Sequence, residues 1–323
     1  MKTLFPLIPS GVFETYWRFA YERQEIFFKR VNREDPPWTE DPILREYKFT
    51  NAYRASDRVS QYLIRNVIYT GDQAPEEVFF RILLFKIFNR IRTWELLKAE
   101  LGEITFSGYG FETYDRILSR LIEEGTPIYS AAYMMPSAGV FGYEKKHRNH
   151  LALIERMMAD RVPGRLVKAK TMQEAFELIR SYPTLGDFLA YQYLIDINYS
   201  EITNFDEMAF IVPGPGARDG IKKCFQSLGG LSEAEAIRFV AEKQGEIFAG
   251  LGLKFRDLWG RPLQLIDCQN LFCEVDKYLR MANPEVNGIS GRVRIKQKYK
   301  ANASPIDYFY PPKWGINQRI SRH

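Results

Sequence analysis

Residues 210–225 read FIVPGPGARDGIKKCF, and the types and spacing of these residues could bind an anion. We expect the Pro-Gly-Pro-Gly stretch to turn between two short helices, because residues 204–208 have helix-compatible polarity and apolar residues recur at helical spacing after Gly216. Glycine would let the chain adopt positive φ there and approach a ligand closely. Backbone N–H groups at the start of the second helix could then hold one phosphate of a nucleic-acid backbone without reading its sequence. A purely structural turn between two helices is the alternative.

Residues that could contact a nucleic-acid backbone gather at two places. In the turn and the helix after it, the residues with this predicted role are Val212, Gly214, Gly216, Arg218, Lys222 and Lys223. Near the end of the chain, basic residues alternate with mostly apolar ones at Arg292, Arg294, Lys296, Lys298 and Lys300. This period of two predicts an extended segment with five positive charges on one face. We interpret Arg294, Lys296 and Lys298 as DNA contacts, and a solvated face is the alternative.

Helical periodicity dominates the elements that must position these residues, so we expect a mainly α protein. The first predicted helix starts near Val12, and a loop with three prolines follows at residues 32–42. The later predicted helices span residues 51–69, 75–100, 111–124, 148–160, 171–181, 186–198, 232–249 and 267–281. The helix over residues 75–100 is apolar on most sides, which indicates a buried position in a large α domain.

Composition limits the class of protein and its surroundings. The 323 residues allow two domains or one elaborated domain, and the formal net charge of +5 permits a nucleic-acid partner without demonstrating one. Charged residues at 26% and apolar residues at 46% exclude a disordered chain, a collagen-like chain and a coiled coil. Three cysteines cannot form a disulfide framework, which favours free, mostly buried thiols in a reducing compartment. No secretory signal or apolar stretch of membrane-spanning length is recognisable, so we expect a soluble, cytoplasmic protein.

Two sequence phrases resemble those of a known superfamily. The turn VPGPG at residues 212–216 is similar to the Leu-Pro-Gly-Val-Gly-like hairpin of the helix-hairpin-helix DNA glycosylases. In that superfamily a catalytic aspartate opens a later helix, and LIDCQNLF at residues 265–272 matches this context at Asp267. The phrases GPGARDGIKKCF, DCQNLFCEVDKYLR, YKFTNAYRASDRVSQYLI and DFLAYQYLIDINYSE more specifically resemble the glycosylase-like helical domain associated with phage thymine hypermodification. That group includes the helical part of hydroxymethyluracil DNA kinases and α-glutamyl/putrescinyl thymine pyrophosphorylases.

The resemblance implies a glycosylase-like fold with some departures. It implies one elaborated helical domain over residues 1–300, with an insertion at about residues 226–262 between hairpin and aspartate, and a C-terminal strap over residues 301–323. Arg218 stands where the Schiff-base lysine of bifunctional members would fall, which favours a monofunctional enzyme. Three cysteines cannot supply the four-cysteine iron–sulfur cluster of some members. We therefore expect neither a cofactor nor a metal ion.

The function implied by this resemblance is a DNA glycosylase that removes a modified pyrimidine, leaves an abasic site and serves in defence against phages. Asp267 would stabilise positive charge on the sugar and direct the attacking water. Because a stacked base cannot be reached, the base would be flipped into a pocket. The aromatic content of 15% offers partners for stacking, and the predicted pocket residues are Phe49, Asn51, Tyr53, Arg54, Tyr191, Gln192, Gln269 and Asn270. The expected partner is double-stranded DNA with modified bases.

Alternatives remain open from the sequence. The chain could be a base-modification enzyme acting on a thymine or hydroxymethyluracil substituent, or a non-catalytic module that binds modified DNA. Asp267 could serve as a helix cap, since aspartate is favoured there. His147 and His150 on a basic stretch favour a solvated helix start over a metal site. Asp196 could orient an active-site group or be a buried paired acid. No G-x-x-x-x-G-K-[ST] motif occurs, which argues against a kinase formed by this chain alone.

Overall fold

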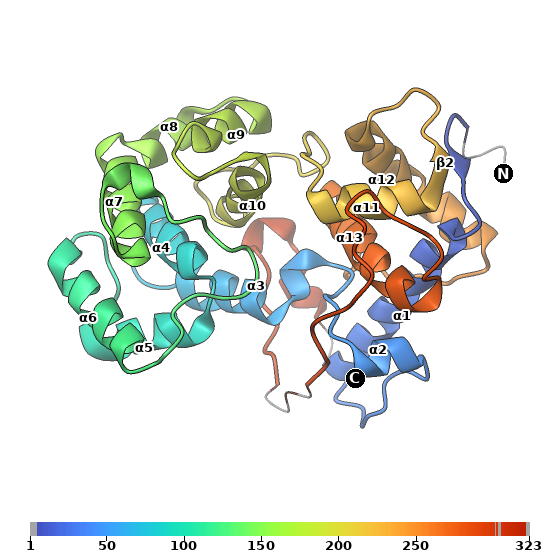
Figure 1. The fold of residues 1–323 in the computed structure, drawn as a ribbon, viewed down its shortest axis with the longest axis horizontal. Helices are drawn as coiled ribbons and strands as arrows, with labels where there is room; N and C mark the ends of the chain where they lie inside the picture. Colours follow the sequence, from blue (N-terminus) through green and yellow to red (C-terminus); the bar gives the residue numbers. More distant parts are fainter. Residues whose placement is uncertain (1–4, 301, 303–304, 321–323) are drawn as a thin grey trace. The chain divides into compact units, whose positions relative to one another are not determined.

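The computed structural model describes residues 5–300, 302 and 305–320, and it is mainly helical (Figure 1), as the periodicity predicted. Residue contacts divide the chain into two compact units. Unit 1 contains residues 1–57 and 210–323, and unit 2 contains residues 58–209. Whether both units form the one elaborated domain expected from the sequence stays a prediction. Among the described residues, no helix is long and apolar enough to cross a membrane.

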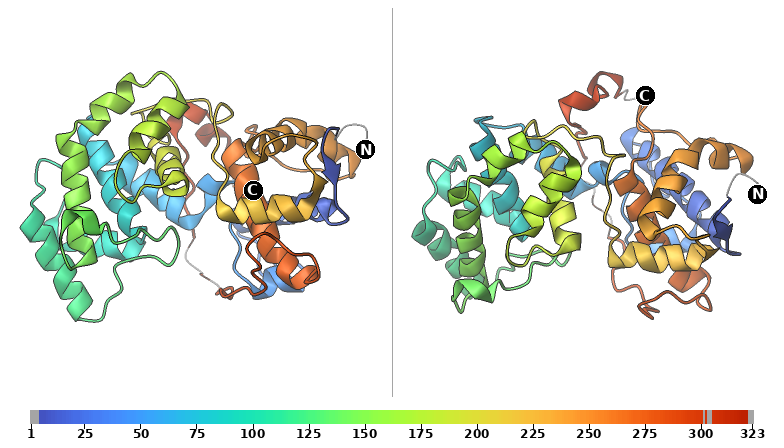
Figure 2. Two further views of the ribbon diagram at one scale, coloured as in Figure 1. Left: turned by 45° about the horizontal axis from the view of Figure 1, so that its top comes forward. Right: turned by 90° about the horizontal axis from the view of Figure 1, so that it is seen from above.

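The core of unit 1 is built around helix α13 (Leu265–Ala282). Helices α1 (Phe13–Val31), α2 (Pro42–Glu46), α11 (Pro215–Cys224) and α12 (Glu233–Gly250) pack against it, as the views of Figure 2 show for α1, α11 and α12. The short 3-10 helix η2 (Arg54–Ser56) also contacts α13. Strands β1 (Ile8–Pro9) and β2 (Phe225–Ser227) pair antiparallel beside the end of α11. Contacts on several sides explain why eleven of the α13 residues are buried.

The predicted insertion and strap both have definite structure in unit 1. Within residues 226–262 the chain completes β2 and forms α12, whose N-terminus carries a capping box between Ser232 and Glu235. The described part of the predicted strap contains the 3-10 helices η5 (Pro312–Trp314) and η6 (Asn317–Arg319). Its Tyr310 is fully buried and its hydroxyl is 2.9 Å from the Ser56 hydroxyl. Residues 301, 303–304 and 321–323 of the strap lie outside the described residues.

Unit 2 is a bundle around helix α4 (Pro75–Phe88), on which twelve residues are buried, as its apolar sequence predicted. The remaining elements of this unit are α3 (Arg58–Leu63), the π-helix η3 (Ile64–Ile68), α5 (Ile91–Leu101), α6 (Phe111–Glu123), η4 (Gly139–Phe141), α7 (Lys146–Ala159), α8 (Val162–Lys168), α9 (Met172–Arg180) and α10 (Asp187–Ile197). Helices α5, α7, α8 and α10 contact α4. The central helix therefore buries its apolar surface against neighbours on several sides.

Several predicted boundaries were wrong for local physical reasons. The helix predicted over residues 75–100 is interrupted at Asn89, which adopts the left-handed conformation that asparagine tolerates better than most residues. The helix predicted from residue 51 does not begin there, because the Asn51 side chain bonds the Ser56 carbonyl and its N–H bonds Asp57, which closes a turn. Residues 204–208 are not helical, since both side-chain groups of Asn198 bind the backbone of Phe205 in a loop. The short helices α2 and α8 were not predicted.

Candidate nucleic-acid interface

The Pro-Gly-Pro-Gly turn enters α11 directly, but only one helix flanks it. Residues 198–214 form turns and coil, so the predicted helix–turn–helix arrangement is wrong on its N-terminal side. Gly214 is the N-cap with φ −77°, and Gly216 lies inside the helix, so neither has the positive φ that we expected. The N–H of Gly214 donates to Oε1 of Gln269 at 3.3 Å. Gln269 of α13, a predicted pocket residue, therefore lies against the turn and is buried there.

Glycine is required in α11 because of the close approach of α13. A Cβ on Gly216 would lie 2.2 Å from Sγ of Cys273, and a Cβ on Gly220 would lie 2.0 Å from the carbonyl oxygen of Phe272. Both distances are far below van der Waals contact, and the two glycines are one helical turn apart on the same face. The glycine spacing in GPGARDG therefore serves the packing of two helices.

The three predicted cations of α11 have different environments. Arg218 and Lys222 are exposed and lie one turn apart, and Arg218 forms a 3.4 Å ion pair with Glu233. Lys223 is 3% exposed, and its Nζ lies 3.0 Å from Oδ1 of Asp276. Lys223 is therefore not a surface cation, and its predicted role as a DNA contact is wrong because the side chain faces α13.

Residues 288–300 form a turn followed by an irregular segment, which is attached to three helices of unit 1 (Figure 1). Asp219 of α11 accepts the N–H of Ser290 at 2.7 Å and its hydroxyl at 2.5 Å. Further along, Arg280 of α13 donates to the Arg294 carbonyl at 3.0 Å, and the N–H of Tyr299 donates to the Glu46 carbonyl at 2.9 Å. These bonds fix residues 288–300 to the surface of unit 1.

We call the exposed cations of this surface the basic track: Arg218, Lys222, Arg292, Arg294, Lys296, Lys298 and Lys300. The segment does not form the predicted strand, because it pairs with other backbone only at the isolated bridge between Tyr47 and Lys298. Its apolar residues are not buried either, and Val293 is 61% exposed. Lys298 forms an ion pair with Glu46, and Arg292, Arg294, Lys296 and Lys300 are exposed. Clustered exposed lysine and arginine is the electrostatic arrangement that attracts phosphate backbones.

Asp267 lies at the start of α13 and is 5% exposed. Its Oδ1 accepts the N–H of Arg54 at 2.8 Å, and its Oδ2 accepts the N–H of Gln264 at 3.0 Å as part of a capping box. The capping alternative is thus observed, with the aspartate at the third helical position. The carboxylate also connects α13 to η2, which lies more than 200 residues earlier in the chain.

Other buried charges hold the segment over residues 47–57 in the same way. The N–H of Thr50 donates to Oε2 of Glu274, and the N–H of Asn51 donates to Oδ1 of Asp57, both at 2.9 Å. Arg23 of α1 donates from Nε to the Thr50 carbonyl at 2.9 Å. Burial raises the pKa of Asp57 to about 7, despite the bond from Asn51 and the nearby arginines. The segment is therefore fixed by side chains that satisfy its backbone groups.

The predicted pocket residues of unit 1 do not line an open pocket in the structure. Phe49, Asn51, Tyr53 and Arg54 are each 8% exposed or less, and only Asn270 is partly exposed. The Tyr53 hydroxyl donates to the Arg261 carbonyl at 2.7 Å, and its ring stacks on Phe255. Most of the large side chains that are fully buried are aromatic, so the aromatic surplus mainly fills the core.

The other two predicted pocket residues, Tyr191 and Gln192, belong to α10 of unit 2 and are fully buried. Asp196 follows on the same helix and pairs with Lys86 of α4, its Oδ2 2.6 Å from Nζ, both side chains being at most 3% exposed. The interpretation of Asp196 as a buried paired acid is therefore confirmed. Sequence analysis missed Lys86, whose only signal was a charge within the otherwise apolar run of residues 82–88.

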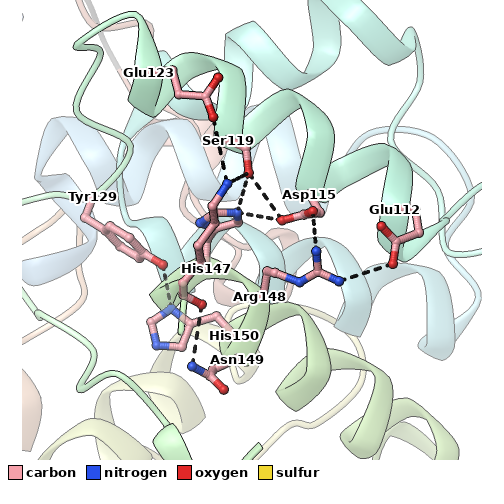
Figure 3. Close-up of polar contacts among 10 residues, drawn as sticks. Glu112, Asp115, Ser119, Glu123, Tyr129, His147, Arg148, Asn149 and His150 are labelled. Carbon is pink, nitrogen blue, oxygen red and sulfur yellow. Dashed lines mark hydrogen bonds and ion pairs between the residues drawn. The ribbon is translucent and has the colours of Figure 1, made fainter. Parts of the chain in front are cut away.

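His147 and His150, whose polar contacts Figure 3 shows, are not part of a solvated helix start, because both are buried. Nε2 of His147 lies 2.7 Å from Oδ1 of Asp115. His150 is bound on both ring nitrogens, by the Tyr129 hydroxyl at 2.7 Å and by the Pro136 carbonyl at 2.6 Å. No group of three or more potential ligands suited to a metal ion is present among the described residues. The cysteines are free, with Cys224 and Cys268 buried and Cys273 partly so, as predicted.

Comparison with known proteins decides the family. The family model described as the helical domain of 5-hmdU DNA kinase matches residues 10–288, which is most of the chain. The chain belongs to this family. It is also 26% identical over 338 aligned residues to the 5-hmdU DNA kinase of Bacillus phage SP10, and the match covers 98% of the chain. The chain spans about half (51%) of the length of that curated relative. No solved structure matches the chain significantly.

This family membership corrects the function expected from the sequence. The prediction of a DNA glycosylase, a hydrolase of N-glycosidic bonds, is wrong, because the matching family and the phage relative are both named for a kinase that acts on 5-hmdU DNA. The subgroup resemblance to the helical part of these kinases is confirmed. The role predicted for Asp267 belonged to the glycosidic reaction. In the 5-hmdU DNA kinase helical domain the observed contacts of this residue are structural.

Proposed function

We propose that this helical domain binds double-stranded DNA through the basic track and serves a base-modification enzyme that acts on the 5-hydroxymethyl group of 5-hydroxymethyluridine. This was the alternative to the glycosylase. The observation that carries the proposal is that residues 288–300 are attached to α2, α11 and α13, and that this segment and α11 together carry seven exposed cations. Such an arrangement favours binding to phosphates independent of sequence.

Phosphoryl transfer to the hydroxymethyl oxygen is the reaction class that the names of the relatives suggest. The sequence has no G-x-x-x-x-G-K-[ST] motif, which is the usual cradle for nucleotide phosphates. We therefore assign to this chain the recognition of the DNA, and we assign no ATP-binding residue to it.

We also propose that the fold is a variant of the helix-hairpin-helix glycosylase scaffold whose hairpin has lost its first helix. Support comes from the turn at residues 212–216, the close packing of α11 on α13, and the aspartate in the first turn of α13. The scaffold would be retained because it holds DNA, while the chemistry has changed.

Binding of the purified chain to a fluorescent 20-base-pair duplex at several salt concentrations tests this function. We expect affinity that falls linearly with the logarithm of salt concentration, with a slope of about −0.9 for each phosphate contact. A chain that binds no duplex even at low salt would overturn the proposal. Addition of labelled ATP and Mg²⁺ to duplexes containing 5-hydroxymethyluridine then asks whether the chain transfers phosphate without further components, and we expect no incorporation.

A further inference from the structure

Apolar side chains are exposed beside the basic track of unit 1. Ile289 is 66% exposed, Val293 is 61% exposed, and Met281 at the end of α13 is 42% exposed. Arg280 of α13 donates to the Arg294 carbonyl, which holds the segment with Val293 near the end of that helix. Single exposed apolar residues are normal on a protein surface, but a group of them among charged residues marks a contact with another molecule.

Ile289 lies in a turn over residues 288–291, which we call the Ile289 turn, and this turn is fixed to α11. The Asp219 carboxylate accepts the N–H and the hydroxyl of Ser290, and it also accepts the N–H of Ile289. A Cβ on Gly288 would lie 2.9 Å from Oδ1 of Asp219, so glycine is needed for this close approach. Gly291 has a φ of 64°, which glycine adopts without strain. A carboxylate that is 1% exposed thus holds the backbone of the turn, while the Ile289 side chain stays in solvent.

Two cations of the basic track lie beside the Ile289 turn. Arg292 follows directly after the turn and interacts electrostatically with Asp219. Lys222 lies three residues after Asp219 on α11, and therefore on a neighbouring strip of the helix surface. Both cations are exposed. A duplex supplies phosphates for such cations and, between the phosphates, the apolar faces of its stacked bases, whereas a protein partner would have to supply matching acids.

We propose that Ile289 is an apolar wedge that inserts between two base pairs from the minor groove of a bound duplex and kinks it; this inference rests on the proposed function. Insertion orders little of the protein, because the turn is already fixed and a β-branched side chain has few rotamers to lose. Unstacking of the base pairs costs free energy. The kinked duplex offsets this cost by presenting more phosphates to the basic track.

A wedge predicts a preference for DNA that is already unstacked at one step. A single unpaired base in the centre of a duplex weakens stacking there, so less free energy is needed to open the step. The wild-type chain should therefore bind a 20-base-pair duplex with one central unpaired base about tenfold more tightly than the continuous duplex. A surface that only contacts phosphates would bind both duplexes about equally.

The test compares the two duplexes by fluorescence anisotropy at one salt concentration. Ile289→Ser should reduce the tenfold ratio to about twofold, and the salt dependence should not change, because no charge is lost. Ile289→Leu keeps an apolar side chain and should keep most of the ratio. Ile122→Ser is the matched control, since Ile122 of α6 is 46% exposed but is followed by Glu123 and Glu124, which repel phosphates. This control should behave as the wild type.

Energy transfer between dyes on the two ends of the continuous duplex measures the kink. Binding of the wild-type chain should increase the transfer, and binding of Ile289→Ser at saturating protein should not. A wild-type chain that binds neither duplex would contradict the proposed function. Binding by the wild type without a kink, or a ratio and a kink that survive in Ile289→Ser, would overturn the wedge alone. An equal loss of affinity for both duplexes in Ile289→Ser would also overturn it, because this result indicates contact without insertion.

Discussion

The carboxylate of Asp267 accepts the backbone N–H of Arg54 at 2.8 Å, which joins the start of α13 to the segment over residues 47–57. The other oxygen of the same carboxylate caps Gln264 at 3.0 Å. Removal of the carboxylate would leave both N–H groups buried without this acceptor. The residue thus has a measurable structural role.

We predict that Asp267→Ala lowers the free energy of unfolding by about 2–6 kcal/mol, because two buried N–H groups lose their acceptor and each costs about 1–3 kcal/mol. Asp267→Asn should lose less stability, since the amide oxygen can still accept one of the two N–H groups. Denaturant unfolding followed by circular dichroism measures both. Glu112→Ala, at an exposed acid in the first turn of α6, is the control and should change stability by less than about 0.5 kcal/mol. Equal stability of Asp267→Ala and wild type would refute the structural role.

The glycines of α11 allow a test of helix packing. Gly216→Ala should destabilise the protein through contact with Sγ of Cys273, and the added change Cys273→Ala should restore part of the loss. Gly220→Ala meets the Phe272 carbonyl, which no side-chain change can remove, so it should cost more, above about 3 kcal/mol. Gly245→Ala in α12 has open space and should be neutral or slightly stabilising. Thermal melts of these four variants rank the effects. In a fifth variant, a rescue of Gly220→Ala by Cys273→Ala would contradict this account.

Adjacent lysines on α11 should behave in opposite ways. Lys222→Ala removes one exposed charge of the basic track, so the slope of log affinity against log salt should become shallower by about 0.9 with stability unchanged. Lys296→Ala should do the same. Lys223→Ala removes the partner of Oδ1 of Asp276, while Arg280 still pairs with Oδ2, so it should cost about 1–3 kcal/mol of stability. DNA titrations and unfolding curves on the same preparations distinguish these outcomes. If the Lys222→Ala, Lys296→Ala double variant has the salt slope of the wild type, the assignment of the basic track to the DNA interface is contradicted.

His150 should make the protein sensitive to acid. Burial lowers the pKa of His150 to about 4, so the folded state holds the neutral ring while the unfolded chain takes up a proton near pH 6.5. The resulting stabilisation is fully present above pH 6.5 and is lost as the pH falls towards 4, by about 3 kcal/mol in total. His150→Gln should be less stable than wild type at pH 7, and this difference should shrink by pH 4. Unfolding curves across this range provide the measurement, and a constant difference would contradict the assignment.

The sequence by itself determined most of the helices and the buried character of α4, because local periodicity reports which side of a helix avoids water. It also located the exposed cations of residues 292–300, because burying several charges costs a large amount of free energy. The phrases around Asp267 and Asp196 were sufficient to indicate the family that the comparison then established. These are properties of neighbouring residues along the chain.

Only the tertiary structure decided which face of each helix meets which partner. Lys222 and Lys223 are consecutive, yet one is exposed and the other is buried against Asp276 because α13 covers a single side of α11. The partner of Asp267 is Arg54, and the partner of Lys86 is Asp196, each far away in sequence. Such pairs form because burial forces distant polar groups to satisfy one another, a requirement that depends on packing and leaves no periodic trace in the sequence.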